Sequence, residues 1–210
     1  MFRDRKDAGG RLAEALKEYR DCADMVLAIP RGGVQIGIDV ARELGIDFSM
    51  IISRKLPFPD NPESGFGAVA EDGSLYLIPR AEKILTTDVI NSIIQKQKSV
   101  IRKRIRVLRK GRPLPEIKGK SVIITDDGIA MGSTMMASIA LCRNQQADRI
   151  IVAVPVAGPR TIDHIRTKAD DLVVLESPAF FQAVAQVYEH WTDVTDEEVL
   201  ELLESHMEAG

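Results

Sequence analysis

Apolar residues follow two spacings along the chain, and these predict alternating strands and helices. Short β-branched runs predict buried strands over residues 25–29, 48–53, 122–124, 149–156 and 172–175. Between the runs, apolar residues recur every three or four positions, which predicts helices over residues 8–20, 34–44, 81–109, 138–146 and 161–168. This alternation is typical of an α/β fold with a parallel β-sheet and helices on both faces.

Residues 56–78 depart from the alternation. The stretch 56–66 carries three prolines and a glycine, so we expect an irregular loop that is long enough to act as a lid. Two short apolar runs, 67–69 and 75–78, flank Glu71-Asp72-Gly73-Ser74 and predict a hairpin. The hairpin falls within the lid region and is followed by the long helix.

The end of the chain differs again. Residues 178–191 hold four aromatic residues, although aromatic residues make up only 5% of the sequence. Thr195 then precedes Asp196-Glu197-Glu198, a pattern that predicts a capped final helix to about residue 207.

The composition limits the class of protein. With 210 residues, 45% of them hydrophobic, the chain can bury one good core, so we expect a single domain. The net charge of −3 gives no overall attraction to nucleic acid or to an anionic membrane. Two cysteines without metal-site spacing, the lack of a signal-peptide core and the lack of a transmembrane-length apolar run favour a reducing cytoplasm.

The second half of the long helix is strongly basic. Residues 95–112 include nine Lys or Arg residues and no acid. Such a helix is a solvated surface, a nucleic-acid or membrane element, or a contact with a second subunit in a homo-oligomer. Because no aromatic residue interleaves these charges, the pattern disfavours nucleic acid.

Residues 121–134 hold the strongest chemical signal. A buried strand leads into Asp126 and Asp127, and small residues then open the next helix. Ligands of open α/β sheets bind at this end of the strands. The carboxylates are suited to accept hydrogen bonds from sugar hydroxyls, and the N–H groups at the helix start are suited to bind phosphate. A sugar phosphate needs both, whereas the structural alternative is a strand, an acidic turn and a helix cap.

Two further cationic segments follow predicted strands. Pro30-Arg31-Gly32-Gly33 brings an arginine and two glycine N–H groups to a strand end, which suits pyrophosphate. Arg54 and Lys55 come directly after the strand over 48–53, so we expect two more cations at the same edge of the sheet. An ordinary turn and a solvated surface are the structural alternatives.

The order of two acids, a short spacer and Gly-Ser-Thr resembles the phosphoribosyl-pyrophosphate motif of the type I phosphoribosyltransferases. The resemblance covers roughly residues 25–176. It implies that Asp126 and Asp127 hold the ribose hydroxyls. It also implies a ribose 5-phosphate site that continues through Gly128, Ile129, Ala130, Met131, Gly132, Ser133 and Thr134. The family usually has Thr or Ser at the position of Met131, so one hydroxyl donor is missing here.

The resemblance also implies the rest of the site. Arg31, Gly32 and Gly33 would bind pyrophosphate, often through a backbone geometry that only glycine tolerates easily. Arg54 and Lys55 would neutralise the leaving group, and a further alternative for the basic residues of 95–112 is that a share of them reaches the pyrophosphate. Magnesium would bridge the substrate oxygens and be reached by the two acids through water.

A variable hood covers the base in this family, and the aromatic tail is the candidate for it. Phe181 and Trp191 would then stack on the base, while the structural alternative is that they close a small core. We therefore expect one domain over residues 1–210. It would have a core over about 25–176, an insertion of lid, hairpin and long helix over about 56–118, and a hood over about 177–210.

The expected function is transfer of the 5-phosphoribosyl group from phosphoribosyl pyrophosphate to a nitrogenous base, with release of pyrophosphate. The alternatives are a phosphoribosyl-pyrophosphate-responsive regulator that binds nucleic acid and a degenerate, non-catalytic family member. Enzymes for 6-oxopurines commonly carry a third acid where this chain has Ala130, so hypoxanthine and guanine are expected to be poor acceptors.

Overall fold

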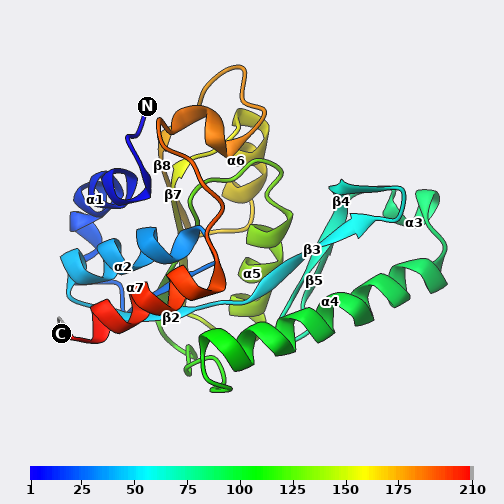
Figure 1. The fold of residues 1–210 in the computed structure, drawn as a ribbon, viewed down its shortest axis with the longest axis horizontal. Coiled ribbons are helices and arrows are strands. Elements are labelled where there is room, and N and C mark those ends of the chain that lie inside the picture. The colour runs from blue at the N-terminus through cyan, green and yellow to red at the C-terminus, as the bar shows by residue number, and fades with distance from the viewer. Residues whose placement is uncertain (209–210) are drawn as a thin grey trace.

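The computed structural model describes residues 1–208 and places the site on a central sheet of five parallel strands (Figure 1). In spatial order the strands are β2 (Asp47–Met50), β1 (Met25–Ala28), β6 (Ser121–Thr125), β7 (Arg149–Val156) and β8 (Asp171–Glu176). The predicted parallel sheet is therefore confirmed. All carboxyl ends of parallel strands lie along one edge, which collects the loops that follow them.

Helices cover both faces of the sheet, as predicted. The helices of the central domain are α1 (Arg5–Ala15), α2 (Gly33–Leu44), α5 (Ser133–Asn144) and α6 (Pro159–Arg166). Val26 and Ile123 point towards α1 and α2, whereas Leu27 and Ile124 point towards α5 and α6. Because strand side chains alternate between faces, both faces need apolar residues, which explains the continuous apolar runs.

The predicted helix boundaries shift by a few residues. The helix expected over 8–20 is α1 followed by a short 3₁₀ helix, Lys17–Tyr19, and α5 begins five residues earlier than expected, at Ser133. The earlier start of α5 brings its first turn next to the acid pair. That placement makes its N–H groups part of the candidate site.

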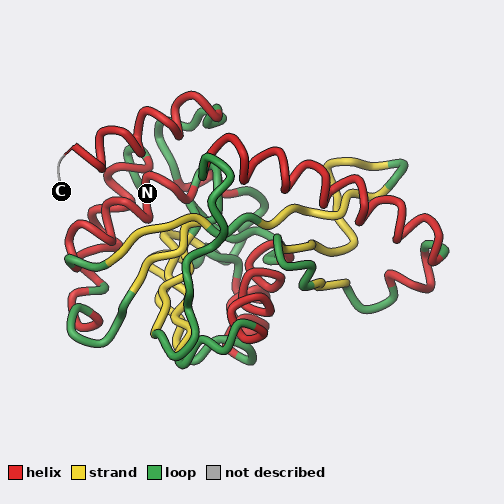
Figure 2. Tube along the Cα trace, turned by 90° about the horizontal axis from the view of Figure 1, so that it is seen from below, coloured by secondary structure: helices red, strands yellow, loops and turns green. Residues whose placement is uncertain are grey.

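The insertion forms an arm that projects from the core (Figures 1 and 2). Its antiparallel sheet contains β3 (Ser53–Phe58), β4 (Asn61–Ala70) and β5 (Leu75–Leu77). The prediction of an irregular loop over 56–66 is wrong, because β3 and β4 pair with each other through this stretch. Pro57 is tolerated since β3 is an edge strand and its register shifts on both sides of this residue. The hairpin between residues 67–69 and 75–78 is confirmed as β4 and β5.

The strand expected over 48–53 is present as β2, but its predicted end is wrong. β2 ends at Met50, and Ser53 already begins β3 in the second sheet. The buried residues Ile51 and Ile52 link the two sheets, so one apolar run serves two strands. Arg54 and Lys55 therefore lie within a strand of the arm and not in a loop at the edge of the parallel sheet.

The long helix is interrupted near its start. The short helix α3 (Ala81–Ile84) comes first, and Thr86 then caps α4 (Thr87–Leu108), accepting a hydrogen bond from Val89 N at 3.5 Å. Ile90, Ile94 and Ile101 are buried against the arm and the core. The basic side chains Arg102, Lys103 and Arg106 are exposed.

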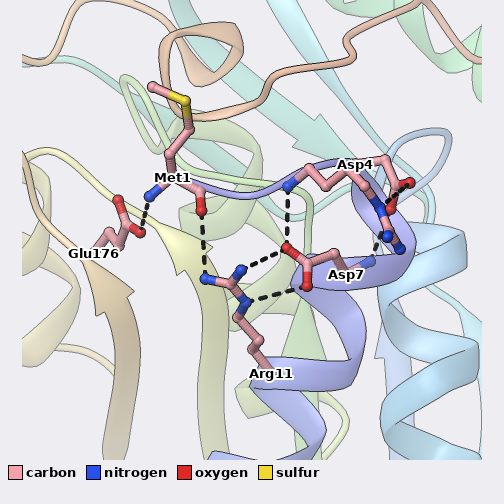
Figure 3. Close-up of polar contacts among 6 residues, drawn as sticks. Met1, Asp4, Asp7, Arg11 and Glu176 are labelled. Carbon is pink, nitrogen blue, oxygen red and sulfur yellow. Dashed lines mark hydrogen bonds and ion pairs between the residues drawn. The ribbon is translucent and has the colours of Figure 1, made fainter.

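The N-terminal segment lies against residues 187–190 of the tail. Phe2 N donates to Val187 O at 2.7 Å, and Glu189 N donates to Phe2 O at 2.9 Å. The amino group of Met1 donates to Glu176 Oε1 at 2.5 Å. Figure 3 shows this contact and the side chain of Arg11 between Asp7 and Met1 O. The tail therefore lies against the N-terminal segment.

The final helix α7 (Asp196–Glu208) confirms the predicted cap. Thr195 Oγ1 accepts from Glu198 N, and Glu198 Oε2 accepts from Thr195 N. Buried Val199 packs α7 into the core that α2 and α4 share. Among residues 1–208, no helix has the length and apolar content needed to cross a membrane.

Candidate functional site

The acid pair follows β6 at the carboxyl edge of the sheet, as predicted. Asp127 N donates to Asp126 Oδ1 at 2.9 Å, so the two residues form a tight turn. Asp126 lines a cavity of about 280 Å³ with Lys55 and the loop 128–134. The structure therefore brings together the acids, the predicted phosphate loop and one predicted cation.

Burial controls the protonation of the pair. It raises the pKa of Asp126 well above its ordinary value of 3.8, and the negative charge of Asp127 raises it further. Burial also raises the pKa of Asp127, although the Arg5 guanidinium opposes this shift. A bound cation or hydroxyl donor would stabilise the charged carboxylates and so relieve this cost.

Arg5 is a site residue that the sequence pattern did not indicate. Its Nε donates to Asp127 Oδ2 at 2.9 Å, and only 12% of its side chain is exposed. Nη1 donates to Thr192 O at 2.9 Å, and the guanidinium lies 3.9 Å from the ring centre of Trp191. Arg5 thus connects the first helix, the acid pair and the tail.

The aromatic residues Phe181, Tyr188 and Trp191 pack against the same apolar cluster but make different contacts. Tyr188 donates its hydroxyl to Asp127 O at 2.7 Å and packs 5.1 Å from Trp191 between ring centres. One face of Trp191 is already covered by Arg5. Phe181 instead lines a cavity of about 650 Å³ with Ala130, Met131 and the start of α6. The two predicted base-stacking residues therefore do not lie in one pocket.

The loop from Gly128 to Thr134 leaves donors available. Gly132 has a φ of 78° and precedes α5, and no side chain caps this helix. The first N–H groups of a helix lack internal acceptors, so those of Ser133 and Thr134 are suited to an anion. Met131 is 69% exposed and lines the cavity beside this helix start.

The second glycine loop packs directly on the acid pair. The Pro30–Arg31 peptide bond is cis, and Gly32 precedes α2 without a side-chain cap. A Cβ at Gly32 would lie 1.8 Å from Asp127 Oδ2, and one at Gly33 would lie 2.8 Å from Asp126 Cα. Gly32 has an ordinary helical φ of −59°, so glycine is required here for space and not for backbone geometry.

Arg54 and Lys55 point to opposite faces of β3, as neighbours in a strand do. Lys55 lines the cavity of the acid pair and donates to Glu63 O at 2.5 Å. Arg54 points towards α4, where its Nε donates to Gln97 Oε1 at 3.4 Å. The two predicted cations therefore reach different parts of the site.

The donor chemistry of the acid pair fits magnesium only together with a ligand. Within residues 1–208, no three His, Cys, Asp or Glu side chains are grouped to hold a metal ion. Magnesium commonly uses one or two carboxylates and completes its shell with water and phosphate oxygens. Asp126 and Asp127 supply that number of carboxylates.

An acid pair between two glycine-started helices, on the carboxyl edge of a parallel sheet, defines a phosphoribosyltransferase-like structure. The chain belongs to the family of the phosphoribosyl transferase domain, whose model matches residues 3–189. It is 35% identical over 206 residues to the Mycobacterium tuberculosis protein named "Putative phosphoribosyl transferase Rv0571c". That match covers 97% of this chain and 46% of the relative, so the chain spans about half the length of the curated relatives it matches.

Solved structures agree with this assignment. The crystal structure of TT1426 from Thermus thermophilus is 38% identical, with a TM-score of 0.82 and 98% of each chain covered. The purine phosphoribosyltransferase from Pyrococcus horikoshii is 17% identical, with a TM-score of 0.50 and 90% of each chain covered, which shows the shared fold alone.

Proposed function

We propose that this protein transfers the 5-phosphoribosyl group from phosphoribosyl pyrophosphate to a nitrogenous acceptor and releases pyrophosphate. One observation carries the proposal. The helix starts at Gly32 and Gly132 have no side-chain cap, as is also true of α3 and α6, but these two lie beside the acid pair; α1, α4 and α7 are capped by Asp4, Thr86 and Thr195. Two free anion sites on either side of two carboxylates match a sugar with a phosphate at each end.

Each part of the substrate has a partner in this arrangement. The ribose hydroxyls donate to Asp126 and Asp127, and the 5′-phosphate accepts from the N–H groups of Ser133 and Thr134. The pyrophosphate lies on the loop of Arg31, Gly32 and Gly33. Lys55, which lines the same cavity as the acids, faces the phosphates.

The reaction then depends on position and charge. The acceptor nitrogen donates its electron pair to the anomeric carbon as the bond from that carbon to the pyrophosphate oxygen breaks. Pyrophosphate leaves with those electrons, and the acceptor nitrogen releases its proton to solvent. The acid pair faces the positive charge that develops on the ribose. A magnesium ion held through water by Asp126 and Asp127 would neutralise charge on the pyrophosphate.

The acceptor site argues against 6-oxopurines. Ala130 carries no proton-transferring group, and its carbonyl accepts from Thr161 Oγ1 at 2.7 Å. Val184 stands over Gly128, since a Cβ at Gly128 would lie 2.6 Å from a Val184 methyl group. We therefore expect hypoxanthine and guanine to be poor acceptors.

Pyrophosphate release is the direct test. The protein is incubated with phosphoribosyl pyrophosphate, magnesium and, in turn, adenine, hypoxanthine, guanine, uracil and orotate. We expect release with at least one acceptor other than the two 6-oxopurines. Turnover limited to hypoxanthine or guanine would contradict the acceptor assignment, and tight substrate binding without turnover on any base would contradict the catalytic one.

The exposed face of α4 favours a second candidate function, a regulator that binds phosphoribosyl pyrophosphate and nucleic acid. Arg102, Lys103 and Arg106 are exposed, and none of them forms an ion pair within residues 1–208. Binding of RNA or DNA that weakens steeply with salt would support this candidate. Binding that is absent at low salt would remove it.

A further inference from the structure

Three arginines from separate elements gather where the arm joins the core. Arg31 comes from the loop before α2, Arg54 from β3 and Arg104 from α4. Arg54 Nε lies 3.4 Å from Gln97 Oε1 of α4, about two helical turns before Arg104, and the positive charges of Arg31 and Arg54 both act on Arg104. Asp196, in the first turn of α7, is a carboxylate whose charge acts on Arg54 and Arg104, and its Oδ1 lies 3.8 Å from Arg31 Nη1. We call Arg31, Arg54 and Arg104 the arginine cluster.

The arginine cluster is poorly neutralised. Arg54 and Arg104 are half-buried, and in the described part of the chain neither forms an ion pair with a carboxylate. Burial lowers the pKa of both guanidinium groups, and the neighbouring arginines lower it further. One carboxylate therefore faces three cations, which leaves an excess of two positive charges.

Arg109 has a structural role and provides a comparison with Arg104. It lies five residues after Arg104, at the end of the same helix, and is buried. Nη1 donates to Met50 O at 3.1 Å, and Nη2 pairs with Glu71. Arg109 thus has a carboxylate and a carbonyl of its own, which Arg104 lacks.

Asp196 is held loosely in the arginine cluster. Its Oδ1 is buried and accepts no hydrogen bond from any residue in the range 1–208. A well-formed ion pair between arginine and a carboxylate has an N–O distance of about 2.7–2.9 Å. The 3.8 Å between Asp196 Oδ1 and Arg31 Nη1 is longer than this, and among residues 1–208 Asp196 forms no ion pair with Arg54 or Arg104. A diphosphate carries more charge and more acceptor oxygens.

We propose that Arg104 binds the pyrophosphate group together with Arg31 and Arg54, and that Asp196 occupies their site when no ligand is bound. The inference rests on the proposed function, because Arg31 belongs to the loop that faces the acid pair. It adds Arg104, a residue of the arm, to the binding site. It also makes Asp196 an internal competitor of the polyphosphate.

The test compares Arg104→Gln with Arg102→Gln, which removes the same charge from an exposed position on the same helix. Inorganic pyrophosphate and ribose 5-phosphate are titrated separately by calorimetry. Arg104→Gln should weaken pyrophosphate binding about tenfold or more and leave ribose 5-phosphate unchanged. Arg102→Gln should change pyrophosphate affinity by less than about twofold. Arg104→Lys, which keeps the charge, should lie between the two.

Asp196→Asn tests the competitor. It should strengthen pyrophosphate binding by about threefold to tenfold, because the ligand no longer displaces a carboxylate. Thermal unfolding shows that each variant is folded.

Equal losses in Arg104→Gln and Arg102→Gln, or an unchanged affinity in Asp196→Asn, would overturn the inference and leave the proposed function standing. Unaltered protein that binds ribose 5-phosphate but not pyrophosphate would also overturn it. Unaltered protein that binds neither ligand would overturn both.

Discussion

The chain contains two Asp-Asp pairs at opposite ends of the same sheet, and their surroundings are opposite. Asp126 and Asp127 follow β6, and burial raises the pKa of both. Asp170 and Asp171 lie at the start of β8. Asp170 accepts from Arg143 Nη2 at 2.7 Å and from Ile150 N at 2.7 Å, and these bonds lower its pKa.

The difference shows that the dipeptide alone does not indicate function. At the amino end of the parallel strands, donors of the protein satisfy the carboxylates, so Asp170 and Asp171 fasten α5, β7 and β8 together. At the carboxyl end, Asp126 has no cation of its own within residues 1–208 and faces a cavity. Incomplete satisfaction at the edge of the sheet where ligands of α/β folds bind is the basis on which we propose Asp126 and Asp127 as the functional pair.

The largest expected effect concerns binding. Asp126→Asn with Asp127→Asn should weaken ribose 5-phosphate binding by about 100-fold, because two charged acceptors are lost. Asp170→Asn with Asp171→Asn is the matched control and should leave this affinity unchanged. Titration calorimetry measures both. A similar loss in the two double variants would remove the distinction between the pairs.

The second prediction uses the glycine loop that covers the functional pair. Gly33→Ala should lower the free energy of unfolding by about 1–3 kcal/mol, since its Cβ would meet Asp126 Cα. Ribose 5-phosphate and pyrophosphate should both bind less tightly to this variant, because the acid pair must move. Gly10→Ala, in open space on α1, is the control and should be neutral or slightly stabilising. Chemical denaturation measures the free energy of unfolding of both variants. An unchanged value for Gly33→Ala would show that the loop is not tightly packed against the acids.

The third prediction compares stability against pH. The pKa of Asp126 is raised in the folded protein. Relative to high pH, this favours the folded state below pH 3.8, where Asp126 is protonated, and the advantage is lost as pH rises through the folded-state pKa. Asp126→Asn should therefore be more stable than the unaltered protein at pH 7, by about 1 kcal/mol, and the gap should close towards pH 4.

Asp170→Asn should do the reverse. Its lowered pKa gives stability that is present above pH 3.8 and is lost as pH falls through the folded pKa. Because the side chain is 39% exposed, the loss at pH 7 should be less than about 1 kcal/mol. Denaturation curves at several pH values would contradict the comparison if both variants changed in the same direction.

The smallest expected effect concerns Arg5. Arg5→Gln removes the cation that opposes the raised pKa of Asp127, so the pH midpoint of ribose 5-phosphate binding should move upward. Arg5→Lys keeps the positive charge, so the pH midpoint of ribose 5-phosphate binding should stay close to that of the unaltered protein. At pH 8 the loss of affinity should be only severalfold. A pH-independent loss in Arg5→Gln would indicate a purely structural role.

Much of the fold was predictable because local patterns are strong. The β-branched runs at β1, β6 and β7 are buried on both faces, so their identity as strands depends on few distant contacts. The positions of the acids at the end of β6 and of the glycine before α2 were also predictable, because they directly adjoin these strong local patterns. The stretch 56–66 was misread because proline content indicates a loop only until an edge strand accommodates it.

The sequence by itself determined the parallel sheet, the position of Asp126 and Asp127 at a strand end, and the two glycine helix starts. Only the tertiary structure decided which charged side chains lie next to these acids and helix starts. Arg5 lies 122 residues from Asp127, and the arginine cluster joins a loop, an arm strand and a helix. Such contacts leave no periodic trace in the sequence, because a single long side chain reaches its partner through the packing of whole elements.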